Sequence, residues 1–209
     1  MLGQTNKAPH GTGSEHRPAP AGALLPDRAT PRPRAQSCGD FAIRITRDGR
    51  WHYRGSPIDR KELVCLFASV LRREEDGSFW LETPVERGRI EVEDAPFLAV
   101  EMFWRQCPDV DGNPRQCLTF RTNLDEIVTA DPAHPIRVRL CPKTRQPSPY
   151  VTIRPGLEAR LTRSVFYELV ALAEAEAIDG RQVLGVWSEG VFFPIDDLPP
   201  ESEAEALSA

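Results

Sequence analysis

The stretch FAIRITRDGRWHY, residues 41–53, decides the fold, because apolar and polar residues alternate on both sides of a turn signal. Alternation is the pattern of a strand with one buried face. Asp48-Gly49 between two such segments predicts a β-hairpin with a type I′ turn. A second stretch, YVTIRPGLEARL at residues 150–161, has the same form around Pro155-Gly156. The chain therefore contains the same strand–turn–strand pattern twice.

An amphipathic segment after each hairpin predicts a helix. In the first, Asp59 can cap the helix, and Glu62 completes a capping box. The second begins at Thr162, and each helix precedes an aromatic strand, around Trp80 and Trp187 respectively. The expected buried faces consist of Leu63, Leu66, Phe67, Val70 and Leu71 in the first helix and of Phe166, Leu169, Val170 and Ala173 in the second. We therefore expect an α+β fold of duplicated hairpin–helix–strand units with antiparallel sheets.

Composition divides the chain into four parts. Both ends carry few apolar residues and many prolines or acids, which is typical of disorder. The loop-like segment 105–116 separates the two repeats. The predicted parts are a Pro-rich disordered tail (1–37), an N-terminal α+β domain (38–104), a C-terminal α+β domain (105–195) and an acidic disordered tail (196–209).

Charge and hydropathy exclude several classes of partner. The two tails carry +3 and −5, so the remaining core carries −3 of the total charge of −5. A mildly acidic core argues against binding duplex nucleic acid, which requires a basic face. The longest apolar run near the start, residues 21–25, is too short for a signal peptide core or a membrane span. We therefore predict a cytoplasmic protein without membrane association.

Cysteine and histidine positions indicate neither a redox motif nor a metal site. The five cysteines are odd in number and form no C-x-x-C pair, so we expect reduced thiols. Cys107, Cys117, Cys141 and His134 share one loop-rich region, but their spacing matches no common zinc finger. We therefore expect no metal.

Enzyme motifs are also missing from the sequence. It contains no G-x-G-x-x-G, H-E-x-x-H or G-x-S-x-G pattern. Gly180 and Gly185 have P-loop spacing, but Val186 and Trp187 occupy the positions where Lys and Ser or Thr would hold phosphate and metal. The motifs favour a protein that is not an enzyme and that carries no cofactor.

Several strings taken together carry a resemblance to a known family. They are Gly49-Arg50-Trp51, Leu81-Glu82-Thr83-Pro84-Val85-Glu86, Ile90-Glu91-Val92-Glu93-Asp94-Ala95-Pro96-Phe97, Pro149-Tyr150-Val151 and Leu184-Gly185-Val186-Trp187-Ser188-Glu189-Gly190. Over about residues 38–195 the chain resembles the proteobacterial family of unknown function 1285. The resemblance implies a duplicated α+β core, a C-terminal half similar to the pleckstrin-homology fold and no established enzymatic activity. It also implies a ligand site between the halves, suited to a nucleotide, and a role in signalling.

A basic run in the second half is the positive signal for a site. Residues 136–163 hold seven cations and one acid, Glu158. Arg137 and Arg139 share one strand face because side chains alternate. Arg163 falls in the first turn of the second helix, where a cation is unfavourable unless an anion is bound. Helix N–H groups and a guanidinium together suit a phosphate. The alternative is that these are solvated surface charges paired with nearby acids.

Three functions stay open on the sequence. The first is a non-enzymatic ligand-binding protein of signalling or regulation, with a small anionic, nucleotide-like ligand between the repeats. The second is a module that binds a protein or peptide along a strand edge. The third is a hydrolase that uses carboxylates such as Glu86 and Asp94. The predicted ligand-binding residues are Arg163, Arg137, Arg139, Trp187, Ser188, Asn123, Arg121, Tyr150 and Glu86.

The composition of the tails yields a first test. Neither tail carries enough apolar surface to offset the entropy of ordering it. A truncated chain of residues 38–195 should melt within a few degrees of the full chain, measured by circular dichroism. Loss of the cooperative transition in the truncated chain would show that a tail packs on the core.

Overall fold

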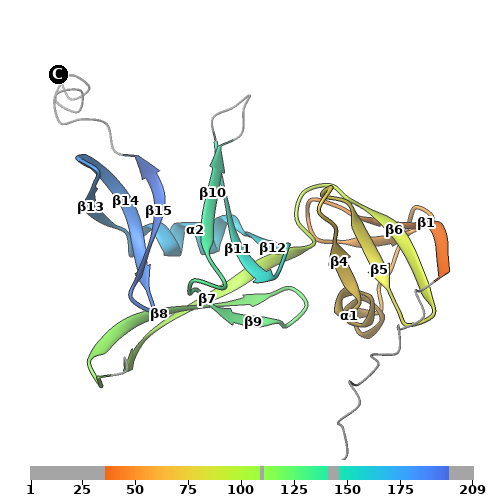
Figure 1. The fold of residues 1–209 in the computed structure, drawn as a ribbon, viewed down its shortest axis with the longest axis horizontal. Coiled ribbons are helices and arrows are strands. Elements are labelled where there is room, and N and C mark those ends of the chain that lie inside the picture. The colour runs from red at the N-terminus through yellow and green to blue at the C-terminus, as the bar shows by residue number, and fades with distance from the viewer. Residues whose placement is uncertain (1–35, 109–110, 141–145, 198–209) are drawn as a thin grey trace, which may run out of the picture. The chain divides into compact units, whose positions relative to one another are not determined.

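The computed structural model describes residues 36–108, 111–140 and 146–197, and most of its elements are labelled in Figure 1. The first sheet has six strands in the order β3 (Ser56–Pro57), β2 (Trp51–Tyr53), β1 (Gln36–Ile45), β6 (Glu86–Val92), β5 (Phe79–Glu82) and β4 (Leu71–Arg73). The second has the order β10 (Ile136–Leu140), β11 (Pro147–Arg154), β12 (Leu157–Leu161), β7 (Phe97–Pro108), β8 (Pro114–Thr122) and β9 (Ile127–Thr129). A third sheet contains β13 (Glu174–Ile178), β14 (Arg181–Ser188) and β15 (Val191–Asp197).

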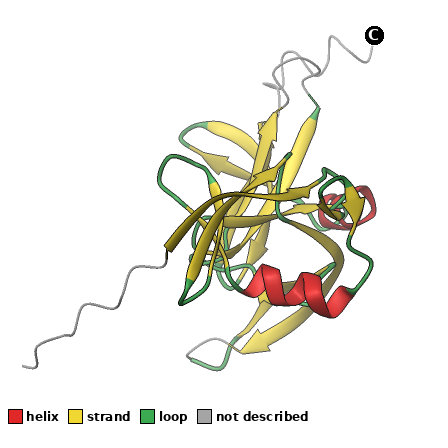
Figure 2. Cartoon of the chain, turned by 90° about the vertical axis from the view of Figure 1, so that its right-hand side faces the viewer, coloured by secondary structure: helices red, strands yellow, loops and turns green. Residues whose placement is uncertain are grey.

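Two short helices accompany these sheets in the described part of the chain, α1 (Lys61–Ser69) and α2 (Arg163–Val170). Strands make up most of the cartoon in Figure 2. The prediction of an α+β fold is therefore wrong, and the chain is mostly β. Neither described helix is long and apolar enough to cross a bilayer.

The predicted duplication with antiparallel sheets is also wrong. Both six-stranded sheets are mixed, because β1 pairs in parallel with β6 and β12 pairs in parallel with β7. After α1, strands β4 to β6 continue the sheet of the preceding hairpin, whereas after α2, strands β13 to β15 form a sheet of their own. The local order of hairpin, helix and strand recurs, but the sheet order does not. A pleckstrin-homology-like C-terminal half gains no support from this arrangement.

The hairpins themselves form where the sequence predicts them. Ile45 lies opposite Trp51 across the first turn, and β11 pairs with β12 around Pro155-Gly156. The first turn differs from the predicted type I′. Only Gly49 has a positive φ, 77°, and its N–H donates to the Thr46 carbonyl, as in a type I turn followed by a glycine bulge.

The predicted helix starts are correct only for α2. α2 begins at Arg163 after Thr162, as expected, but the Thr162 side chain makes no capping hydrogen bond. α1 begins one residue later than predicted, with Arg60 instead of Asp59 at the cap position, so the capping box of Asp59 and Glu62 does not form.

The prediction of the buried helix faces is largely wrong, because Leu169 alone of the predicted residues is fully buried within α1 or α2. α1 buries Val64 and Ala68, and α2 buries Val165 and Leu169. Trp51 stacks on Phe67 of α1 at 6.4 Å between ring centroids. One cluster of buried apolar residues extends from Ile43 in β1 to Ile195 in β15, so the six-stranded sheets share a continuous core.

The segment predicted to be a loop between domains is largely strand. Residues up to Pro108 belong to β7, and β8 begins at Pro114, so the predicted boundary after residue 104 falls inside β7. The predicted disordered tails lie almost wholly outside the described residues.

Two leucines assigned to one helix face give a matched test of the core. Leu71 is 0% exposed in β4, whereas Leu66 in α1 is 61% exposed. Leu71→Ala should lower the free energy of unfolding by about 2–5 kcal/mol, because it leaves a cavity. Leu66→Ala should change it by no more than about 0.5 kcal/mol. Urea unfolding measures both, and equal losses would contradict the packing described.

Candidate functional site

Asp94 connects several elements through its carboxylate. It follows β6, and its side chain is only 13% exposed. Oδ2 accepts a hydrogen bond from Arg47 Nε at 3.2 Å and lies 3.5 Å from Arg160 Nη1. Oδ1 accepts a hydrogen bond from the Tyr150 hydroxyl at 2.7 Å. We call Asp94, Arg47, Tyr150 and Arg160 the Asp94 cluster.

Strand register brings the members of the Asp94 cluster together. Tyr150 in β11 lies directly opposite Arg160 in β12, and opposite residues of an antiparallel pair share one face. Arg47 belongs to the turn between β1 and β2, and its carbonyl accepts a hydrogen bond from Arg160 Nη2 at 3.3 Å. Its backbone N–H donates to Glu93, next to Asp94. The turn is thus fixed against the second sheet.

A second contact secures the same turn. Asn123 accepts a hydrogen bond from the Leu98 N–H at 3.0 Å, and its amide nitrogen lies 3.4 Å from the Gly49 carbonyl. A Cβ on Gly49 would come within 3.0 Å of both Asn123 and Leu98. Only glycine combines this close approach with the positive φ of the turn.

Beside the Asp94 cluster lies a cavity of about 370 Å³ with three arginines in its wall. Arg47, Arg160 and Arg163 come from the first turn, from β12 and from the start of α2. The remaining lining residues are Gln146, Pro147, Ser148, Pro149, Leu161 and Phe166. We call this hollow the arginine cavity.

The start of α2 adds donors to the arginine cavity. The Thr162 hydroxyl lies 3.2 Å from the Ser164 hydroxyl and leaves the first helical N–H groups without a side-chain cap. Uncapped N–H groups and the positive end of the helix dipole attract anions. Among the described residues, Asp94 pairs with Arg47 and Arg160 but not with Arg163, so the three arginines carry an excess positive charge. This arrangement can bind a phosphate or carboxylate.

The structure separates the predicted cations into two sites. Arg163 lies at the arginine cavity, as predicted, with Tyr150 in the adjoining cluster. Arg137 and Arg139 instead line another cavity, of about 270 Å³. Arg139 pairs with Glu158 and lies over the ring of Tyr150, 4.5 Å from its centroid. Two further cations of the basic run, Lys143 and Arg145, lie outside the described residues.

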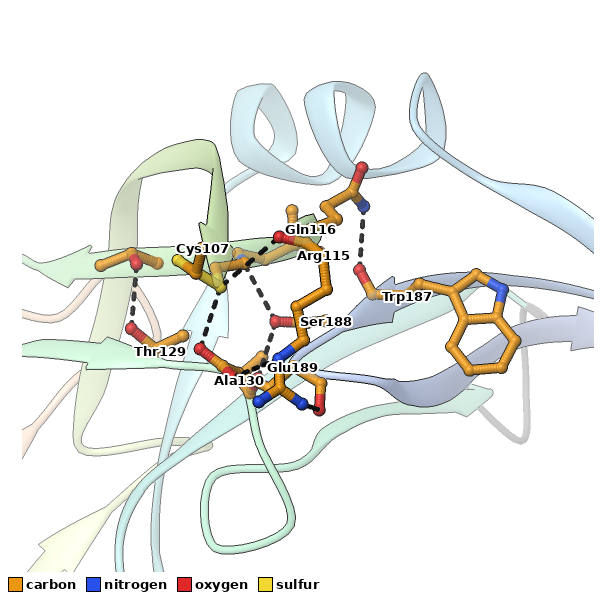
Figure 3. The surroundings of a disulfide bond; sticks show 11 residues. Cys107, Arg115, Gln116, Thr129, Ala130, Trp187, Ser188 and Glu189 are labelled. Atoms are coloured by element: carbon orange, nitrogen blue, oxygen red, sulfur yellow. Dashed lines mark hydrogen bonds and ion pairs between the residues drawn. A yellow bond between two sulfur atoms is a disulfide. The ribbon is translucent and has the colours of Figure 1, made fainter. Parts of the chain in front are cut away.

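Trp187 and Ser188 lie in a different place, shown in Figure 3. Ser188 is fully buried, donates to the Ala130 carbonyl and accepts from the Leu118 N–H. Trp187 is 37% exposed, and its indole N–H donates to Glu176 at 3.2 Å. Both side chains are occupied by contacts that hold β14 against its neighbours.

The other predicted residues serve the fold or lie apart. Arg121 forms ion pairs with Glu101 and Asp125. Glu86 is the first residue of the seven-residue β6, whereas Asp94 follows its last residue, so the two carboxylates suggested for hydrolysis are at opposite ends of that strand.

The sequence interpretation missed Arg47 and Arg160 as site residues. The turn at Pro155-Gly156 alone would place Arg160 opposite Val151, and a register shift between Thr152 and Arg154 places it opposite Tyr150 instead. No sequence signal indicated Arg47, since its position depends on contacts between segments distant in sequence.

The prediction of reduced cysteines is corrected for one pair. A disulfide joins Cys107 in β7 to Cys117 in β8, with 6.1 Å between their Cα atoms (Figure 3). The hairpin of β7 and β8 brings them together, and the sequence did not reveal it because this segment was interpreted as a loop. Cys65 is a free thiol.

Comparisons with known proteins agree with the family resemblance. Residues 32–95 match the model described as "Domain of unknown function (DUF1285), N-terminal domain", and residues 96–195 match the corresponding C-terminal domain. A DUF1285 family protein of Silicibacter pomeroyi DSS-3 has a similar crystal structure, with 42% identity, a TM-score of 0.69 and coverage of 82% of this chain and 87% of that one. One from Shewanella baltica OS155 shares 28% identity, with a TM-score of 0.48 and coverage of 63% and 91%. Comparison with curated proteins finds no match.

The hydroxyl of Tyr150 gives a test with a pH signature. Burial, then the hydrogen bond to Asp94 and its negative charge, raises the pKa of Tyr150 above the usual 10.0. The folded state therefore holds this proton more tightly than the unfolded state, and the resulting stability is present below about pH 10 and lost as the pH rises above it. Tyr150→Phe should cost about 1–3 kcal/mol at pH 7, and its deficit relative to the wild type should shrink above about pH 10.

Urea unfolding at a series of pH values measures this difference. Tyr167→Phe is the matched control, since Tyr167 is 63% exposed, and should change stability by at most about 0.5 kcal/mol. A Tyr150→Phe variant as stable as the control at pH 7 would mean that the bond to Asp94 contributes nothing.

Proposed function

The chain belongs to the DUF1285 family, and we propose that it is a non-enzymatic regulatory protein that binds a small phosphate-bearing ligand, such as a nucleotide, in the arginine cavity. The observation that carries this proposal is the convergence of Arg47, Arg160 and Arg163 on one hollow at the start of α2. Guanidinium groups bind phosphate oxygens in pairs of hydrogen bonds, and helix N–H groups add further donors.

The three arginines have different tasks in this proposal. Asp94 holds Arg47 and Arg160 in place, so their guanidinium groups are oriented before a ligand arrives. The described residues give Arg163 no ion pair, and its side chain is exposed. A ligand phosphate would be the counterion of Arg163, and it would also offset the unfavourable position of a cation at a helix start.

The size of the arginine cavity limits the ligand. Its volume of about 370 Å³ lies at the lower end of the usual range for small-molecule sites, about 300–1,000 Å³. Phe166, Leu161 and Pro149 supply an apolar wall beside the arginines. Such a wall suits the ribose or base of a mononucleotide. None of the described residues that line the arginine cavity is an Asp or a Glu.

A thermal-shift comparison of nucleotides with their nucleosides tests the ligand class. A ligand that binds only the native state raises the melting temperature. Nucleoside mono-, di- or triphosphates should stabilise the protein, whereas the nucleosides, which lack phosphate, should not. Equal shifts for a nucleotide and its nucleoside would count against an anion site.

Variants of Arg163 test the position of the ligand. Arg163→Ala should leave stability unchanged or slightly raised, because a cation is removed from the positive end of the helix dipole. It should weaken binding of the best nucleotide by about 1.5–3 kcal/mol, and Arg163→Lys should restore only part of this, since the planar two-pronged contact is lost. Isothermal titration and melting measure both effects.

Arg137→Ala is the matched control, because Arg137 belongs to the same basic run but lines a different cavity. It should bind the nucleotide as the wild type does. A destabilised Arg163→Ala variant with unchanged affinity would assign Arg163 to the fold instead.

One observation favours protein binding as a second candidate. β12 pairs with β7 only from Phe97 to Ala99, and further along β7 Phe103 and Trp104 are 51% and 60% exposed. Leu118, opposite Trp104, turns its backbone groups away from β7, toward Ser188 and Ala130. The pair of Trp104 and Leu118 is therefore not hydrogen-bonded, and the backbone N–H and C=O of Trp104 point to the edge of β7 that faces away from β8. An extended peptide could add to this edge of β7 as a further strand.

Trp104→Lys should abolish binding of peptides selected from a library, because a lysine on an edge strand disfavours pairing with another chain.

A further inference from the structure

Two sulfur atoms and one carboxylate meet where the β7–β8 hairpin lies against the turn between β14 and β15 (Figure 3). The Sγ atoms of Cys107 and Cys117 and a carboxylate oxygen of Glu189 all lie within 4.8 Å of one another. Cys117 is fully buried, and the other two are partly buried. A partly buried carboxylate thus lies beside the two sulfurs.

We propose that, once the disulfide is reduced, Cys107, Cys117 and Glu189 form a binding site for Zn²⁺. Two thiolates and one carboxylate oxygen are ordinary zinc ligands, and a water molecule completes a tetrahedron. Reduction by a cellular dithiol adds two electrons and two protons to the disulfide, and the dithiol becomes a disulfide in turn. Zinc then displaces the two thiol protons into solvent.

The frame that holds the three ligands is set by backbone pairing. Cys107 lies opposite Arg115, and Cys117 lies opposite Arg105, so the two cysteines are diagonal neighbours across one hairpin. Glu189 is fixed by its backbone N–H, which donates to the Gln116 carbonyl at 2.9 Å. Zinc binding would therefore require small side-chain rotations rather than the ordering of a loop.

The carboxylate of Glu189 is oriented as a zinc ligand requires. Oε1 lies 2.9 Å from Cys117 Sγ, whereas Oε2 lies 3.3 Å from Arg115 Nε on the other side. Arg115 is held in turn by donating from Nη1 to the Glu189 carbonyl at 3.0 Å. One oxygen thus faces the sulfurs while the other is held by a guanidinium, which is how outer partners orient metal-binding carboxylates.

Charge balance supports the same site. Two thiolates, one carboxylate and Zn²⁺ carry a net charge of −1, which would be costly to bury alone. The guanidinium of Arg115 brings the total to zero. Cys141 and His134, which share a loop-rich region of the sequence with the two cysteines, are not part of this site. Cys141 lies outside the described residues, and His134 Nδ1 lies 3.0 Å from Asp131 Oδ1 instead.

Zinc and the disulfide exclude one another, because both use the same sulfur atoms. A disulfide or a zinc ion would each link β7 to β8 near the end of their hairpin. Only zinc would also bind Glu189, and so link the turn that follows β14 to these two strands. Oxidation would release the ion, and the turn would then be held to the hairpin by the hydrogen bonds seen in the disulfide form, such as that from the Glu189 N–H to the Gln116 carbonyl.

Zinc titration of the full chain, reduced and held without oxygen, tests this proposal. A thiol assay first confirms that all five cysteines are reduced. The protein should bind one Zn²⁺ in competition with a chromophoric chelator, and Co²⁺ in its place should give the visible bands of a tetrahedral ion with thiolate ligands. Glu189→Gln keeps both sulfurs and should weaken zinc binding at least tenfold, and Cys117→Ser should abolish it.

The matched control replaces the other three cysteines, Cys38, Cys65 and Cys141, by Ser together. This variant should bind zinc as the wild type does, with the same Co²⁺ spectrum. Failure of the fully reduced wild type to bind zinc would overturn the proposal. So would zinc binding that survives Glu189→Gln unchanged or disappears in the three-cysteine control.

Discussion

The contacts of the Asp94 carboxylate are the interaction on which the candidate site depends. A carboxylate this far withdrawn from water is stable only when its oxygens have charged or hydrogen-bonding partners. Arg47 supplies one partner from the turn after β1, and Arg160 and the Tyr150 hydroxyl supply the others from the distant β11–β12 hairpin. Removal of any one partner leaves the others less well satisfied. The charge network around Asp94 therefore fixes two of the three arginines that line the arginine cavity.

The same network explains why one arginine remains available. Asp94 serves Arg47 and Arg160, whereas Arg163 begins a helix whose cap position makes no side-chain hydrogen bond. The fold thus places a cation where the helix dipole disfavours it. Among the cations of the basic run within the described ranges, Arg154 and Arg139 have acidic partners, Glu126 and Glu158. Arg160 is also paired, with Asp94, so three of the five described cations of the basic run have acidic partners.

Local features were predictable from the sequence, and distant pairings were not. The hairpins at Asp48-Gly49 and Pro155-Gly156 depend on neighbouring residues, and so does the start of α2 at Arg163. The parallel pairing of β1 with β6 and of β12 with β7 joins distant strands, and no local pattern encodes it. Ser188 is an example at a single residue. In the sequence it belongs to a polar turn, but in the structure its hydroxyl is buried between Ala130 and Leu118.

The most direct measurement is a titration of the full chain with pyrophosphate, followed by NMR of the arginine Nε–Hε groups. The largest shifts should arise at Arg163 and Arg160, which line the arginine cavity, with little change at Arg137, which lines a different one. The shifts should saturate as expected for one site and disappear in Arg163→Ala. Shifts spread evenly over all exposed arginines, or concentrated at Arg137, would contradict the claim that the arginine cavity is a specific anion site.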